Sequence, residues 1–115
     1  MKRFMAVLLV GLCLAGCEVD EDNYVDIINN GRYQQITVTV NDVLQSRGGK
    51  TVFGPSESLS VKINGDDGEQ FTFFVRIYDL NGWYLNVETR TYYYRENQEV
   101  REMWVVENYY NPYSY

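Results

Sequence analysis

Hydrophobic and polar residues alternate with a period of two along most of the chain after residue 23. Ile36, Val38 and Val40 share one parity, for example, and polar residues occupy the positions between them. This alternation, rich in β-branched and aromatic residues, is typical of strands that bury one face. No segment longer than a turn or two after residue 17 has helical spacing. The predicted strands are 24–28, 33–43, 51–53, 59–63, 70–78, 83–94 and 100–108.

Turn sequences separate these strands at intervals of about 8–12 residues. The strongest are Asn64–Gly68 and Asp79–Gly82, in which Asn, Asp and Gly tolerate the positive φ of tight hairpins. The pattern predicts an all-β fold, a single immunoglobulin-like antiparallel β-sandwich of about seven strands, with a small β-barrel as the alternative. Residues 54–61 (Gly-Pro-Ser-Glu-Ser-Leu-Ser-Val) resemble the strand lead-in of many immunoglobulin-like bacterial envelope domains, although the Cys–Trp–Cys core of antibody domains is absent.

The long strand 83–94 contains the most distinctive side chains. Trp83, Leu85 and Val87 share one parity and are expected to face the core. Tyr84, Tyr92 and Tyr94 share the other parity and would then line the outside. Tyr combines an apolar ring with a hydroxyl group at low entropic cost, which suits recognition of a protein or a sugar. Tyr84, Tyr92 and Tyr94 are therefore the candidate binding surface, although covering of both strand faces, or plain β-propensity, would also explain them.

The first seventeen residues follow the pattern of a secretory signal. Lys2 and Arg3 precede an apolar run that is too short to span a bilayer, which needs about 20 residues. The run ends in Leu14-Ala15-Gly16-Cys17, which resembles the lipobox of bacterial lipoproteins at all four positions. The resemblance implies cleavage before Cys17 and attachment of a diacylglycerol to its thiol, usually with a further acyl chain on the new amino group. Two or more chains hold a protein stably on a membrane.

This interpretation divides the chain into a signal peptide (1–16), an acidic flexible tether (17–23) and a β-sandwich domain (24–115). The acidic run at 18–22 resembles the signal that exports lipoproteins to the cell surface in one large group of Gram-negative bacteria. Its composition is equally that of a solvated linker. The expected location is the outer membrane, lipid-anchored, on either the cell surface or the periplasmic face. Cys13 leaves with the signal and Cys17 carries lipid, so no thiol remains for a disulfide.

Charge and composition exclude several partners. Without Lys2 and Arg3, eight basic residues face sixteen acidic ones, a net charge of about −8. A domain this acidic lacks the basic stripe that nucleic-acid binding needs. The chain contains no His, and no thiol remains after the proposed processing. The usual ligands of transition metals, and the usual bases and nucleophiles of enzymes, are therefore missing.

No catalytic site, cofactor or metal site is predicted. Several acids lie on the segment expected to form the last hairpin, but cross-strand pairs such as Glu88 or Arg90 with Arg101 or Glu102 explain them. The acidic turns 66–69 and 79–82 have oxygen ligands, but neither fits the twelve-residue calcium loop. The acidic residues of the expected hairpin are Glu88, Glu96, Glu99, Glu102 and Glu107, and those of the two turns are Asp66, Asp67, Glu69 and Asp79.

The sequence therefore predicts a non-catalytic, lipid-anchored binding, interaction or structural module. Its expected partners are the membrane, through the lipid on Cys17, and a protein or glycan ligand. The alternative is a periplasm-facing inhibitor of the lysozyme- or protease-inhibitor type, since an acidic domain suits a cationic enzyme target.

Overall fold

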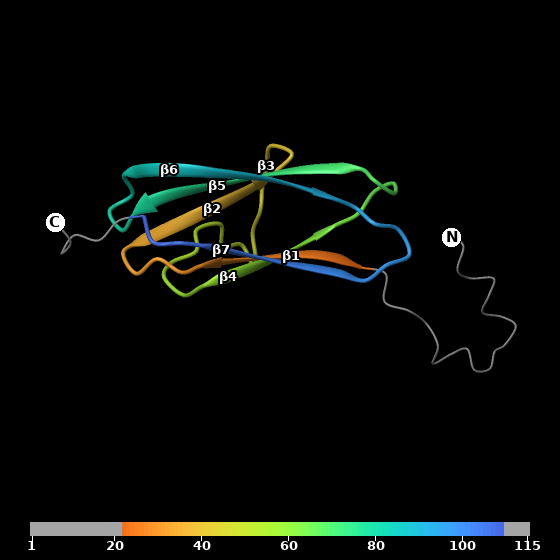
Figure 1. Cartoon of the computed structure of the whole chain (residues 1–115). Coiled ribbons are helices and arrows are strands. Elements are labelled where there is room, and N and C mark those ends of the chain that lie inside the picture. The colour runs from red at the N-terminus through yellow and green to blue at the C-terminus, as the bar shows by residue number, and fades with distance from the viewer. Residues whose placement is uncertain (1–21, 110–115) are drawn as a thin grey trace, which may run out of the picture.

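Seven strands and no helix make up the part of the chain that the computed structural model describes, residues 22–109 (Figure 1). The prediction of an all-β sandwich of about seven strands is confirmed. The strands are β1 (Asn23–Asn29), β2 (Gln34–Val40), β3 (Val43–Leu44), β4 (Ser58–Ile63), β5 (Gln70–Asp79), β6 (Tyr84–Tyr93) and β7 (Val100–Val106).

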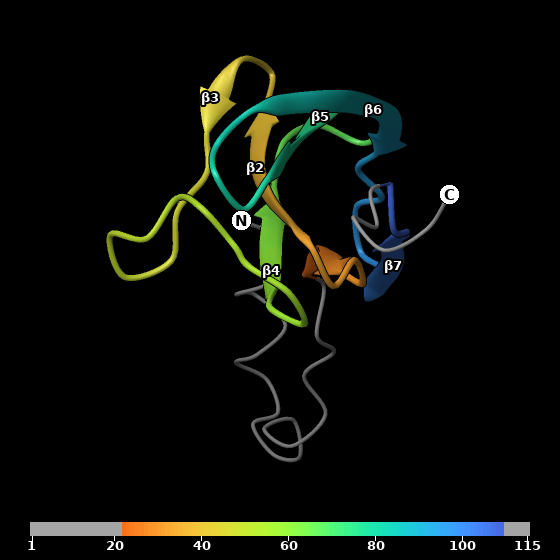
Figure 2. The ribbon, with the colours of Figure 1, turned by 90° about the vertical axis from the view of Figure 1, so that its left-hand side faces the viewer.

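The strands form two sheets that pack face to face, as the end-on view in Figure 2 shows. The first sheet has the order β4-β1-β7 and the second the order β3-β2-β5-β6. After β6 the chain crosses to the other sheet, so β7 runs opposite to β6 and parallel to its neighbour β1. The expectation of a purely antiparallel sandwich is therefore corrected at this one pair. β6 and β7 are both edge strands and belong to different sheets, so the alternative of one closed sheet is not formed.

The core follows the alternation expected from the sequence in four strands. Burial alternates residue by residue along β1, β2, β4 and most of β5. Branched aliphatic residues predominate because their stiff side chains pack well on a pleated surface. The buried hydrophobic residues are Val25, Ile27, Ile36, Val38, Val40, Phe53, Leu59, Val61, Ile63, Phe73, Val75, Ile77, Tyr94, Trp104 and Val106.

In β6 the predicted faces were wrong. Residues paired across an antiparallel ladder share a face, and Val75, which is fully buried, is paired with Glu88. The alternating residues from Asn86 to Tyr92 therefore point between the sheets. The register shifts at the start of β6, where Ile77 is paired with Asn86 but Tyr78 with Tyr84. The extra residue is Leu85, which packs against the core, whereas Trp83 is 72% exposed.

The inward polar residues of β6 are satisfied by a tryptophan from the other sheet. Trp104 of β7 is fully buried, and its Nε1 donates a hydrogen bond to Oε1 of Glu88 at 3.0 Å. The guanidinium carbon of Arg90 lies 4.7 Å from the centroid of a Trp104 ring. β6 and β7 are not hairpin partners, so the cross-strand pairs expected between them do not form. Charges that point inward on an edge strand also discourage pairing with another chain.

The strand predicted over 33–43 is interrupted by a tight turn. Asn41 and Asp42 both have positive φ, at 48° and 67°, and reverse the chain so that Val43 pairs with Val40. Two consecutive residues of this kind are typical of a two-residue hairpin turn. Oδ1 of Asn41 accepts a hydrogen bond from the amide of Thr72. The strand predicted over 51–53 is reduced to one bridge between Phe53 and Ile36.

The domain begins slightly earlier than predicted. Asn23, assigned to the tether, is the first residue of β1 and is 1% exposed. Its amide oxygen accepts from the Arg95 amide, and its Nδ2 donates to the carbonyls of Arg95 and Gln98. The signal peptide, Cys17 and the final residues 110–115 lie outside the described residues.

The sandwich has two poles. The N-terminal pole contains the start of β1 and the loops 64–69 and 94–99, which are hydrogen-bonded to each other (Figure 1). The distal pole contains the turns 30–33 and 79–83, which meet where Gln34 is paired with Asp79. The length of the strands separates these two poles.

Candidate binding surface

The β5–β6 turn at the distal pole is fixed by one carboxylate. Oδ1 of Asp79 accepts hydrogen bonds from the amides of Asn81 and Trp83, both at 2.9 Å. The amide of Gly82 donates to the Asp79 carbonyl, and Gly82 has a φ of 92°, which a residue with a Cβ rarely adopts. Asp at the first position and Gly at the last are what a hairpin of this kind requires. The backbone of the turn is therefore held in one conformation.

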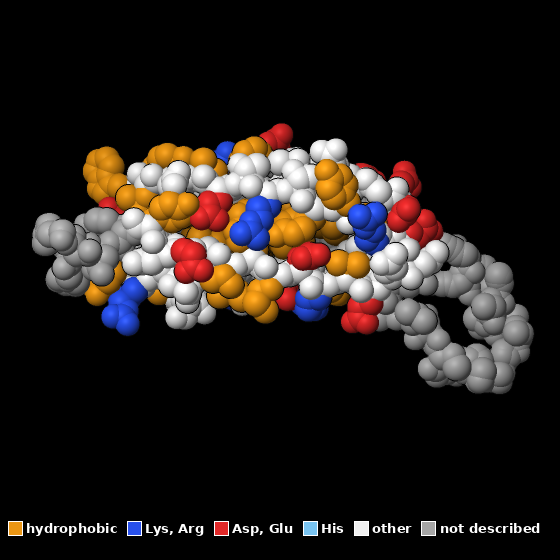
Figure 3. All heavy atoms as spheres, viewed as in Figure 1, with side chains coloured by type: hydrophobic (Ala, Val, Ile, Leu, Met, Phe, Trp, Pro, Cys, Tyr) orange, Lys and Arg blue, Asp and Glu red, His pale blue; other side chains and the backbone are white. Residues whose placement is uncertain are grey.

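This turn presents large apolar side chains to solvent. Leu80 is 52% exposed, Trp83 is 72% exposed and Tyr84 is 57% exposed. The Tyr84 ring meets the half-buried ring of Tyr78 edge-on, with centroids 6.0 Å apart. We call these four residues the aromatic tip. Hydrophobic side chains gather at this end of the molecule over β5 and β6 (Figure 3).

The outer face of the second sheet continues from the aromatic tip and contains no carboxylate. In the described strands β2, β3, β5 and β6, the positions that share a face with Tyr78 and Phe74 hold Thr, Gln, Val, Leu, aromatic residues and one charged residue, Arg76. The guanidinium carbon of Arg76 lies 5.5 Å from the centroid of the Phe74 ring. In a chain with sixteen acidic residues, this face offers a partner little electrostatic repulsion.

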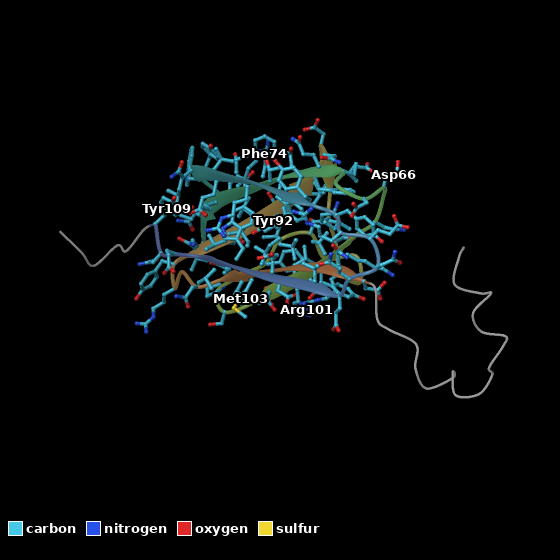
Figure 4. The ribbon with its side chains drawn as sticks, turned by 45° about the vertical axis from the view of Figure 1, so that its right-hand side comes forward. Asp66, Phe74, Tyr92, Arg101, Met103 and Tyr109 are labelled. Atoms are coloured by element: carbon cyan, nitrogen blue, oxygen red, sulfur yellow. The ribbon has the colours of Figure 1, made fainter. Side chains whose placement is uncertain are left out.

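The tyrosines predicted as a binding surface are not brought together. Tyr84 belongs to the aromatic tip. Tyr92 points between the sheets (Figure 4), where its ring lies 5.3 Å from that of Phe73 and 6.4 Å from that of Trp104. Tyr94 is 8% exposed and belongs to the core, at the opposite pole from Tyr84. The reversed faces of β6 explain the difference, because Tyr92 and Tyr94 have the inward parity.

Three of the nine acidic residues considered as metal or catalytic candidates accept hydrogen bonds from backbone amides. Oε1 of Glu69 accepts from the Asp66 amide, and Oδ1 of Asp67 accepts from the Glu96 amide, each at 2.9 Å. Asp79 fixes the β5–β6 turn. No group of three or more potential metal-ligating residues occurs among residues 22–109. The same segment contains no helix long and apolar enough to cross a membrane.

Glu88 also contacts the C-terminal end of the described chain. A hydrogen bond from the Tyr109 hydroxyl to Glu88 is the main cause that raises the pKa of Tyr109, with burial and the negative charge of Glu88 adding to it. Tyr109 is held by its backbone too, since its amide donates to Oε1 of the buried Gln34 at 2.8 Å. The two contacts hold the chain beyond β7 against the distal pole.

Sequence reasoning missed Trp83 and Leu80. The alternation of Trp83, Leu85 and Val87 favoured the core, and nothing in it reveals the extra residue at the start of β6. The available signal was the turn itself. A Gly at the last turn position places the next residue at the mouth of the hairpin, where a large side chain has few neighbours.

No protein-family model matches this chain, and no match was found among curated proteins or solved structures.

Proposed function

We propose that this protein is a lipid-anchored envelope protein whose β-sandwich domain binds a protein or a glycan without catalysing a reaction. The observation that carries the proposal is the exposure of Trp83, at 72%, on a turn whose backbone is fixed by Asp79. Trp is rich in binding energy and is enriched among residues that dominate interfaces. Several large apolar side chains exposed on one turn with a fixed backbone are typical of an interaction site.

The aromatic tip has little use within the fold. Among residues 22–109, the indole of Trp83 forms no ring contact or hydrogen bond, and the Trp83 backbone is hydrogen-bonded to Asp79. The other tryptophan, Trp104, is fully buried and hydrogen-bonded. A rigid turn also lowers the entropic cost of binding, because the backbone that carries these side chains is already fixed before the partner arrives.

The proposed anchor would present this tip to the surroundings. Five residues, 18–22, lie between Cys17 and the first strand residue Asn23. Fully extended, they reach about 20 Å, which keeps the N-terminal pole close to the lipid. The strands then separate the aromatic tip from the membrane. The acid-free face beside the tip supports a partner that is neutral or negatively charged, such as a glycan.

The anchor is tested by changing Cys17 to Ser in the full-length protein. The proposal predicts loss of acyl labelling and a shift from the membrane fraction to the soluble envelope fraction. Cys13→Ser is the matched control and should remain acylated. Equal membrane association of both variants would contradict the proposed anchor.

Binding is tested by probing arrays of immobilised glycans and envelope proteins with the wild-type protein, Trp83→Ser and Met103→Ser. Met103 is the control because it is 65% exposed on the outer side of the other sheet (Figure 4). Trp83→Ser should lose binding by at least about tenfold, with both variants folded by circular dichroism. Equal binding by all three proteins, or no binding by the wild type, would contradict the proposal.

A further inference from the structure

A concave site separate from the aromatic tip lies at the N-terminal pole, where a loop joins the two edge strands. It is a cavity of about 410 Å³ between the end of β6 and the start of β7. This volume lies in the range of small-molecule pockets. Its buried apolar lining includes Val25 and Ile63, and Tyr92 contributes an aromatic ring. Its polar lining includes Arg95, Gln98 and Glu102.

The loop 95–98 on the rim of this cavity is held by the buried side chain of Asn23. The buried side chain of Asn23 accepts from the Arg95 amide at 2.9 Å and donates to the carbonyls of Arg95 and Gln98, both at 3.1 Å. Asn97, between them, has a φ of 62°. A fully buried amide that forms three hydrogen bonds with one loop holds that loop in place. The loop that borders the cavity is therefore held in place by the fold itself.

Two charged side chains of opposite sign line the cavity without an internal partner. Glu102 lies beside Val25 in the parallel pair of β1 and β7, so it shares the inward face of the first sheet. Its carboxylate has no hydrogen bond or ion pair within the described residues, and neither has the guanidinium of Arg95. Arg101, the neighbour of Glu102, points to the outer side and pairs with Asp26 at 2.7 Å.

We propose that this cavity binds a small zwitterion with an apolar portion, with Arg95 receiving the anionic group and Glu102 the ammonium group. Arg presents a planar fork that suits a carboxylate or a phosphate. The apolar lining of Val25 and Ile63 would receive an aliphatic group. Free aliphatic amino acids have this chemistry, and so does the ethanolamine phosphate head group of a membrane lipid, which the proposed anchor would bring near this pole.

The experiment is calorimetric titration of the purified full-length protein in detergent solution. The probes are L-leucine for the amino-acid source, phosphoethanolamine for the lipid source, and N-acetyl-leucine amide, which keeps the leucine side chain but has no charge. Arg95→Gln and Glu102→Gln remove one charge each. Arg32→Gln and Glu107→Gln are matched controls, because both residues lie at the distal pole.

We expect saturable binding of L-leucine or phosphoethanolamine, and the stronger probe identifies the source. Each cavity variant should weaken that binding by at least about tenfold, because each removes one charge-assisted contact. Arg32→Gln, Glu107→Gln and Trp83→Ser should bind the charged probe as the wild type does. The neutral probe should not bind. These results would show that the effect is confined to this cavity.

Three results would overturn the inference. They are no saturable binding of either charged probe, equal binding of the neutral probe, and sensitivity to fewer than both cavity variants. The aromatic tip is at the other pole, so these results leave the proposed function standing, and failure of Trp83→Ser on the arrays leaves this inference standing.

Discussion

Replacing Glu88 with Ala tests the reversed faces of β6 most sharply. Glu88 Oε1 is the acceptor for Nε1 of Trp104, a donor that is completely buried. Leaving a buried donor without a partner costs about 1–3 kcal/mol. The contact with the Tyr109 hydroxyl is lost as well. We therefore expect Glu88→Ala to lower the free energy of unfolding by about 2–3 kcal/mol.

Urea denaturation, followed by Trp fluorescence, measures this difference. Glu88→Gln keeps an acceptor oxygen but replaces a charged acceptor with a neutral one. It should lower the free energy of unfolding by less than about 1 kcal/mol. Glu102→Ala is the control, because the Glu102 carboxylate has no internal partner and a substitution of this kind stays within about 0.5 kcal/mol. If Glu88→Ala and Glu102→Ala are equally harmless, Glu88 faces solvent, and the assignment of its face is refuted.

Two further predictions concern single polar contacts. Burial alone would raise the pKa of Asp26. Hydrogen bonds from Ser60 and Arg101, together with the charge of Arg101, outweigh this effect, so the pKa of Asp26 lies below its ordinary value of 3.8. Asp26→Asn should therefore lower the free energy of unfolding by roughly 0.5–1 kcal/mol at pH 7, and denaturation at several pH values should show the difference disappearing as the pH falls through the lowered pKa; a constant difference would contradict the pair. Asn41→Val should cost about 2 kcal/mol, because a β-branched residue is strained at a φ of 48° and the acceptor for the Thr72 amide is lost. Asn41→Gly loses only the acceptor and should cost about half as much in thermal melts; equal melting temperatures would contradict the account of the turn.

The strands that bury one face could be predicted from the sequence because hydrophobicity alone sets their orientation. In β1 and β2 every inward position is apolar or is an amide held by backbone groups, such as Asn29 and Gln34, and in β5 the inward positions before Asp79 are apolar. The sequence pattern and the core then agree. The parallel pairing of β7 with β1 could not be predicted, because alternation is the same in parallel and antiparallel edge strands.

The candidate site depended on the one strand in which alternation misled. β6 is an edge strand. The polar residues on its inner face contact Trp104 of the other sheet rather than several aliphatic side chains. Glu88 and Arg90 are therefore satisfied by Trp104, a contact between residues far apart in the chain. Once that orientation was mistaken, Tyr92 and Tyr94 were placed outside and Trp83 inside. The turn at Asp79–Gly82, by contrast, could be predicted from its own residues.

The central claim, that the aromatic tip is occupied by a partner in the envelope, can be tested through cysteine accessibility. Asn81 lies in the turn two residues before Trp83 and is exposed, and among residues 22–109 it forms a hydrogen bond through its backbone amide alone. Asn81→Cys therefore places a thiol beside the intact tip, and Met103→Cys places a control thiol on the other sheet. The unsubstituted protein provides the background, since the proposed processing leaves no free thiol.

The measurement is the rate of maleimide labelling of both variants as purified proteins and in intact envelopes. Our account predicts that the envelope slows labelling at position 81 by at least about tenfold more than at position 103, and that adding Trp83→Ser to Asn81→Cys restores the fast rate. Labelling at position 81 that is as fast in the envelope as in the purified protein, or protection that persists without Trp83, would contradict it.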